Sequence, residues 1–277
     1  MDISLLRKAL AKQLAALKRA DSALKDAAVL PAELAPVVYR AAELADELAG
    51  AARELEPGAL RTELERAHAD VMQRAQPALV DAAGKLAAGV AAELGKEAPV
   101  TGQLPDLKWG LLRLEFKLAS GKREVVLWYG PKIARLASAP PVVAEVVAVA
   151  REARASLDVA PLDADAFATE VARAYEDTRR RSNATPHAAV PLLMVLRELV
   201  IARQSSTFLA DPVGDHFDSC YGRVQFSYDL FRAGPRGGLA LGVAAHAQTK
   251  RPEDHLWVPT SHGGDGTHFA SLAVRKT

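Results

Sequence analysis

Residues 112–129 read LRLEFKLASGKREVVLWY, and this stretch decides the fold because the spacing of apolar residues changes here from helical to alternating. Between residues 112 and 118, leucine and phenylalanine alternate with charged residues, which is the period of a strand with one buried face. Ser120-Gly121 then provides a two-residue turn into a second apolar run. The sequence therefore predicts a β-hairpin over residues 110–129.

The stretch before the hairpin, residues 1–98, is rich in alanine and has apolar residues at helical spacing. Breaks at Leu30-Pro31, Pro57-Gly58 and Gln76-Pro77 predict an antiparallel bundle or hairpin of three or four helices. Alanine side chains bury little area, so we expect this region to dock onto a protein partner or to self-associate. Heptad-like spacing, compatible with a coiled coil, is shown by Ile3, Leu6, Leu10 and Leu17.

The remainder, residues 99–277, is predicted to form an α+β body that follows a linker over residues 97–105. We expect helices within residues 142–203 and antiparallel strands within residues 223–276, where residues 224–230 alternate. Two helices followed by a hairpin resemble the order of elements in a winged helix. The predicted fold class is α+β, with N-terminal helices, a central hairpin with helices, and a small C-terminal antiparallel sheet.

The amino-acid composition excludes several classes of function and of binding site. The 35 basic and 34 acidic residues give a net charge of +1, which excludes a strongly basic nucleic-acid binder but permits a local basic patch. A single cysteine, Cys220, excludes an intramolecular disulfide and a zinc site made of thiolates alone. The N-terminal stretch carries charges among its apolar residues, so we predict a cytoplasmic chain with no membrane partner.

A local excess of positive charge surrounds the predicted hairpin. Between residues 101 and 135, seven basic residues outnumber three acidic ones by four, and aromatic residues are interleaved. This pattern predicts contact with the phosphate backbone of DNA or RNA, with bases stacked on aromatic rings. The alternative is a solvated face above a core that contains the aromatics. The predicted nucleic-acid-binding residues are Arg113, Lys117, Lys122, Arg123, Lys132, Arg179, Arg180 and Arg181.

A second hypothesis concerns Asp106, Glu115 and Lys117, which have the acid, then acid-x-lysine order of metal-dependent nucleases. Two carboxylates would hold a divalent ion such as Mg²⁺, and the lysine would orient or activate the attacking water. The alternative is an ordinary charge alternation on the polar face of the hairpin.

A third hypothesis is a metal site, for instance for zinc, formed by His262, Asp265 and His268 on a glycine-rich loop. The alternative is a mobile, solvated loop. Arg181 and His187 also resemble, loosely, the arginine–histidine pair of HEPN-type ribonucleases, although Pro186 interrupts the spacing.

Phosphate-binding glycine motifs and the G-x-S-x-G motif do not occur in the sequence, which argues against nucleotide hydrolysis and serine hydrolysis. We therefore predict a non-enzymatic assembly or adaptor subunit of an intracellular complex, without a cofactor, that contacts nucleic acid through the basic hairpin. The alternative from another class is a metal-dependent hydrolase, most simply a nuclease, using Mg²⁺ or Zn²⁺ at one of the two sites above. A third possibility is a structural subunit that binds only proteins.

Overall fold

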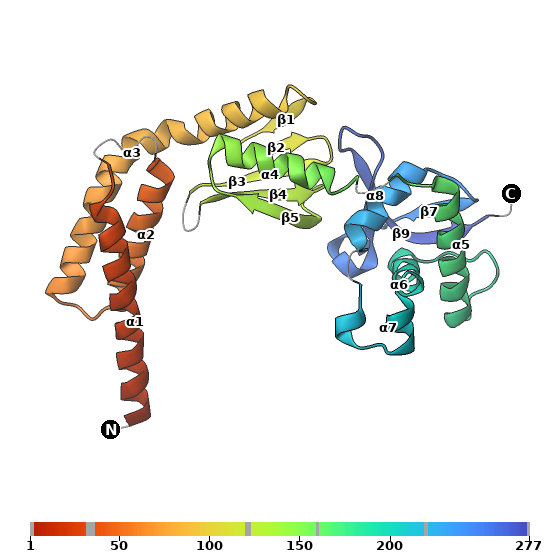
Figure 1. Ribbon diagram of the computed structural model, residues 1–277, viewed down its shortest axis with the longest axis horizontal. Coiled ribbons are helices and arrows are strands. Elements are labelled where there is room, and N and C mark those ends of the chain that lie inside the picture. Colours follow the sequence, from red (N-terminus) through yellow and green to blue (C-terminus); the bar gives the residue numbers. More distant parts are fainter. Residues whose placement is uncertain (1–2, 32–36, 120–122, 159–160, 219–220, 276–277) are drawn as a thin grey trace. The chain divides into compact units, whose positions relative to one another are not determined.

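The computed structural model describes residues 3–31, 37–119, 123–158, 161–218 and 221–275. It confirms the predicted α+β class, with N-terminal helices, a central antiparallel sheet and a small C-terminal antiparallel sheet (Figure 1). The chain divides into two compact units. The first contains residues 1–107, 114–127 and 137–149, and the second contains residues 108–113, 128–136 and 150–277. Within the described ranges, we find no helix with the length and apolarity needed to cross a membrane.

Three helices occupy the N-terminal region: α1 (Ile3–Ala28), α2 (Val38–Glu54) and α3 (Ala59–Leu94). The predicted breaks near Pro31 and Pro57 are confirmed, because one helix ends before each of them. The predicted break at Pro77 is wrong, since α3 continues through this residue and is bent in Figure 1. Proline removes one hydrogen bond of the helix ladder, but Val71 and Ala75 before it are buried against α2, and this packing holds the helix together.

The central sheet has five strands in the order β1-β2-β3-β4-β5. The predicted hairpin is confirmed by β3 and β4, although its turn at residues 120–122 lies outside the described residues. The segment predicted as a linker supplies β1, which is short and lies at the edge of the sheet. The strands are β1 (Val100–Gln103), β2 (Asp106–Trp109), β3 (Leu112–Lys117), β4 (Glu124–Tyr129) and β5 (Ala134–Ala139).

Burial along β3 follows the predicted alternation. Leu112, Leu114 and Phe116 are buried, whereas Arg113 and Glu115 are half-buried and Lys117 is exposed. One face of β3 is therefore apolar, as its sequence predicts, and its charged residues share the opposite face, whereas β4 buries residues on both faces.

The rest of the chain contains five helices and four strands in the described ranges. In order along the chain, these elements are α4 (Val143–Ala155), α5 (Ala164–Arg181), β6 (Val190–Pro191), α6 (Leu192–Ala202), α7 (Ser206–Ala210), α8 (Arg223–Ala233), β7 (Leu239–Val243), β8 (Leu256–Pro259) and β9 (Gly266–Val274). Short 3-10 turns occur at Gly214–His216, Gln248–Lys250 and Pro252–Asp254. Strand β9 pairs antiparallel with β6, β7 and β8.

The elements α5, β6, α6, α8, β7 and β9 follow in this order along the chain, with α7 and β8 between them, so helix α8 stands where the predicted hairpin should begin. Their shared core is built from large side chains, which include Phe167, Tyr175 and Phe226. The phenylalanine rings of Phe167 and Phe226 meet edge to face, with their centroids 6.3 Å apart. This region therefore has a substantial core of its own.

One element was predicted wrongly. Residues 224–230, expected to begin the C-terminal strands, form most of helix α8 instead. Their apolar residues alternate, but the buried residues Phe226, Leu230 and Ala233 also follow the i, i+4, i+7 spacing of a helix face. The sequence satisfies both periods, and packing against the core of α5 and α6 selects the helix. The antiparallel strands predicted within residues 223–276 are confirmed for β7, β8 and β9.

Candidate functional sites

Arg123, a residue of the predicted basic hairpin, is buried immediately before β4, with an exposed fraction of 4%. Its backbone N–H donates to Glu43 Oε1 at 2.8 Å, and its guanidinium Nη1 donates to Asp46 Oδ2 at 2.9 Å. Both carboxylates come from α2. Arg123 thus fastens the start of β4 to α2, and a phosphate group could bind this side chain only by displacing Asp46.

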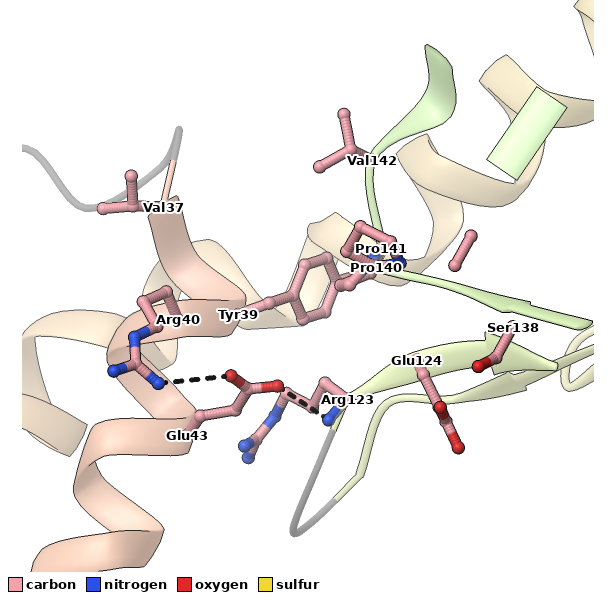
Figure 2. A pocket seen from close by; sticks show the side chains of 11 residues that line it. Val37, Tyr39, Arg40, Glu43, Arg123, Glu124, Ser138, Pro140, Pro141 and Val142 are labelled. Atoms are coloured by element: carbon pink, nitrogen blue, oxygen red, sulfur yellow. Dashed lines mark hydrogen bonds and ion pairs between the residues drawn. The ribbon is translucent and has the colours of Figure 1, made fainter. Parts of the chain in front are cut away.

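Arg123 also lines a pocket of about 460 Å³ between the start of α2 and the end of β5 (Figure 2). The Tyr39 ring lies beside Pro140 in this pocket. The buried Tyr39 hydroxyl has no hydrogen-bond partner in the described part of the chain. Burial raises the pKa of Tyr39, and the positive charge of Arg123 opposes the rise. Arg40 bonds Asp26 and Arg123 bonds Asp46, so both pocket cations are already neutralised and the pocket is not arranged to bind an anion.

The other predicted nucleic-acid-binding residues differ in their exposure and in their partners. Lys117 Nζ lies 3.6 Å from Glu115 Oε2, and Lys122 lies outside the described residues. Arg113 and Lys132 are half-buried.

Two of the three arginines that end α5 are engaged by acids. Arg179 pairs with Glu176 at 2.8 Å, which lowers the pKa of that carboxyl, and Arg181 pairs with the buried Glu198 at 3.1 Å. Arg180 is exposed. Nucleic-acid contact by the residues around the hairpin and on α5 stays a prediction.

The fold brings the predicted nuclease residues close together. Phe116 N donates to Pro105 O at 2.8 Å, and antiparallel pairing counted from this bond places Asp106 opposite Glu115. The adjacent Lys117 is held by Glu115. In the described ranges, however, no group of three histidine, cysteine, aspartate or glutamate side chains is placed to hold a metal ion. The arrangement therefore offers two neighbouring carboxylates and a lysine.

The predicted zinc ligands are not brought together as a cluster, and their loop has a packing role. Asp265 accepts a hydrogen bond from Lys108 Nζ at 3.1 Å, which lowers the pKa of the carboxyl. His262 meets the ring of Phe231 edge to face at 4.9 Å, whereas His268 meets His255 at 4.6 Å. Each of the three residues thus has a different neighbour.

Glycines of the same loop are required by close contacts. A Cβ on Gly266 would lie 2.4 Å from the indole of Trp257, and a Cβ on Gly264 would lie 2.1 Å from Gly110 O. Gly264 also has a φ of +83°, which side-chain-bearing residues rarely adopt. The glycine-rich sequence is therefore explained by packing around Trp257 and against Gly110.

His187 and Arg181 also have separate partners. His187 has a φ of 65° and its Nδ1 lies 2.9 Å from Val274 O, whereas Arg181 bonds Glu198. The resemblance to HEPN-type ribonucleases gains no support from these separate contacts.

Helix α8 occupies the chain position of the helix that enters the DNA groove in a winged helix. All eleven of its residues are buried or half-buried. Tyr228 donates to Asp158 Oδ1 at 2.8 Å, Gln225 reaches Leu157 O, and Ser227 donates to Trp257 O at 2.6 Å. These contacts hold three side chains of α8 against neighbouring segments, and the half-buried residues of the helix are the part that solvent reaches.

Helix α1 carries an exposed apolar surface. The heptad-like spacing in the sequence indicates Leu10 and Leu17 of this surface but not Leu14 and Leu24. The buried residues of α1, among the side chains that the structure describes, are Ala16, Ala20 and Ala23. Its leucines are exposed by 58% at Leu10 and 38% at Leu17; the side chains of Ile3 and Leu6 fall outside the described part. We name the exposed stripe the leucine seam, and it consists of Leu10, Leu14, Leu17 and Leu24.

No protein-family model, no curated protein and no solved structure matches this chain.

Proposed function

We propose that this chain is a non-enzymatic assembly or adaptor subunit that docks onto a partner protein through α1. The observation that carries the proposal is the exposure of the leucine seam on a helix that is attached to α2 through small alanines. Exposed leucines at helical spacing cost free energy in water, and covering them against another helix recovers it. By the C-terminal body we mean residues 150–277, which have a core of their own. Helix α1 would attach this body to the partner protein.

Site-specific photo-crosslinking of the full chain in its native cells tests this proposal. A photoreactive amino acid at position 14, in the leucine seam, is expected to give crosslinks to a second polypeptide. The same group at position 8, on the opposite side of α1, is expected to give few. Equal crosslinking from both positions, or none from position 14, would refute docking through the seam.

Nucleic-acid contact is the second half of the proposal and is carried by charges other than Arg123. We expect Lys117→Glu combined with Lys132→Glu to weaken retention of single-stranded DNA or RNA on a filter at low salt. Lys85→Glu combined with Lys96→Glu, at two exposed residues away from the hairpin, changes the net charge equally and is the matched control. If the double variant is retained as well as the wild-type chain, the proposed nucleic-acid contact is refuted. The protein would then be a subunit that binds only proteins.

A metal-dependent nuclease is the second candidate, because the strands bring Asp106 and Glu115 opposite one another. Its test is cleavage of plasmid DNA and of RNA with Mg²⁺ or Mn²⁺. Activity that disappears in both Glu115→Gln and Asp106→Asn would support this candidate over the adaptor. Activity that survives both substitutions would exclude these two carboxylates as its source.

A further inference from the structure

The leucine seam and the alanine face are two separate stripes of α1. Leu17 and Leu24 each directly follow one of the buried alanines, Ala16 and Ala23, so the seam is rotated by about 100° from the face that packs on α2. The seam residues are spaced by four, three and seven positions, which keeps them on one side of the helix. Ile3, Leu10, Leu17 and Leu24 recur every seven residues, the period of one core position of a coiled coil.

Charge identifies the kind of partner. From residue 3 to residue 20 the helix has five cations and no carboxylate. Lys18 lies one turn after Leu14 and borders the seam as a flanking charge of a coiled coil does, whereas Arg7 lies seven residues before Leu14 and continues the seam toward the N-terminus. Neither Arg7 nor Lys18 has an ion-pair partner within the described part of the chain.

We infer that the leucine seam binds an acidic, leucine-bearing helix of another protein and forms a coiled coil with it. This inference rests on the proposed function and names the chemistry of the partner. The leucines would be covered by apolar residues of the partner helix, and its glutamates or aspartates would meet Arg7 and Lys18.

Two other occupants fit the seam less well. A second copy of α1 would bring together two helices that each have six cations and two carboxylates, so their net charges of +4 repel. An anionic lipid surface would meet Asp21, which lies one turn from both Leu17 and Leu24 and pairs with Lys25 at 2.6 Å. A carboxylate within the apolar stripe is unfavourable at an anionic membrane, whereas a coiled coil accepts a polar residue at a core position at a cost in stability.

The test uses the full chain and three labelled synthetic helices of four heptads each. All three have leucine at the two core positions, and they differ only in the flanking positions, which are glutamate, glutamine or lysine. Fluorescence anisotropy is expected to show roughly tenfold tighter binding of the glutamate helix than of the lysine helix, a preference that shrinks at 0.5 M salt as charges are screened. Leu14→Ser with Leu17→Ser should abolish binding, whereas Leu60→Ser, at another exposed leucine, should not.

Charge-reversal variants distinguish binding at the leucine seam from non-specific electrostatic attraction to α1. Arg7→Glu with Lys18→Glu should invert the preference toward the lysine helix. Lys8→Glu with Lys12→Glu changes the total charge equally on the opposite side of α1 and should leave the order of the three helices intact. Equal binding of the three helices, or inversion by both double variants, would overturn the inference.

The remaining outcomes also decide the question. Stable self-association in sedimentation equilibrium without binding of the glutamate helix would assign the seam to a second copy. Binding to phosphatidylserine vesicles without binding of that helix would assign it to a membrane surface, and either result overturns the inference. Crosslinking from position 14 to another protein, combined with no preference among the helices, would retain the proposed function and reject only the acidic partner.

Discussion

The N-terminal helices and the C-terminal body bury side chains of different sizes. Alanines make up more than half of the buried set of α1 and α2, together with residues such as Leu44 and Leu48. The C-terminal body buries Phe167, Tyr175 and Phe226, which are among the largest fully buried side chains of the described residues. Alanine lets helices approach closely but removes little apolar area from water. The C-terminal body therefore removes more apolar area from water per buried residue, whereas α1 leaves the leucine seam exposed.

The largest expected effect comes from removing a large side chain from the C-terminal body. Phe226→Ala deletes a fully buried ring that contacts Phe167, and we expect it to lower the free energy of unfolding by about 3–5 kcal/mol. Urea denaturation followed by tryptophan fluorescence measures this, since Trp257 is buried in the same region. Phe217→Ala, at a residue that is 43% exposed, is the control. If Phe226→Ala lowers the free energy of unfolding by less than Phe217→Ala does, this core does not stabilise the C-terminal body as proposed.

Arg123→Ala is expected to cost about 2–3 kcal/mol, because it leaves Asp46 without its buried partner and empties a space between α2 and β4. Arg53→Ala, on the exposed side of α2, should have little effect in the same denaturation experiment. We expect Arg123→Ala to destabilise the protein without altering nucleic-acid retention. A loss of retention with unchanged stability would instead return Arg123 to the set of binding residues.

Enlarging an alanine tests the close packing of the N-terminal helices. Ala45→Leu adds three carbon atoms at a fully buried position of α2, and we expect a loss of about 1–3 kcal/mol from overpacking. Ala88→Leu, at an exposed position of α3, should be nearly neutral. Thermal unfolding monitored by the helix signal in circular dichroism gives both values. A stabilising Ala45→Leu would show that these helices have spare internal volume.

The smallest expected effect is a pH dependence of the C-terminal body. Burial, and then the neighbouring His255, lower the pKa of His268 below its ordinary value of 6.5. The unfolded chain therefore takes up this proton more readily than the folded one, so stability is full above pH 6.5 and declines as the pH falls below it. His268→Leu should flatten this slope between pH 7 and pH 5, whereas His246→Leu, at an exposed site, should not. Parallel slopes in the wild-type chain and His268→Leu would show that other groups control the acid response.

Local patterns determined much of the fold. The hairpin of β3 and β4 follows from the alternation around Phe116, and the ends of α1 and α2 follow from Pro31 and Pro57, because period and proline act within a few residues. The strands β1, β2, β5 and β6 were not predicted, because each is only two to six residues long and is stabilised by its pairing with another strand.

Tertiary structure decided what local pattern left open. Residues 224–230 fit a strand and a helix equally well until a core selected the helix, and Pro77 is tolerated because Val71 and Ala75 pack against α2. Arg123 and Asp265 look like ligand-binding charges in sequence, yet Asp46 and Lys108, which are distant along the chain, neutralise them. Sequence records which groups are charged or apolar, and only the folded chain determines which of them already have partners.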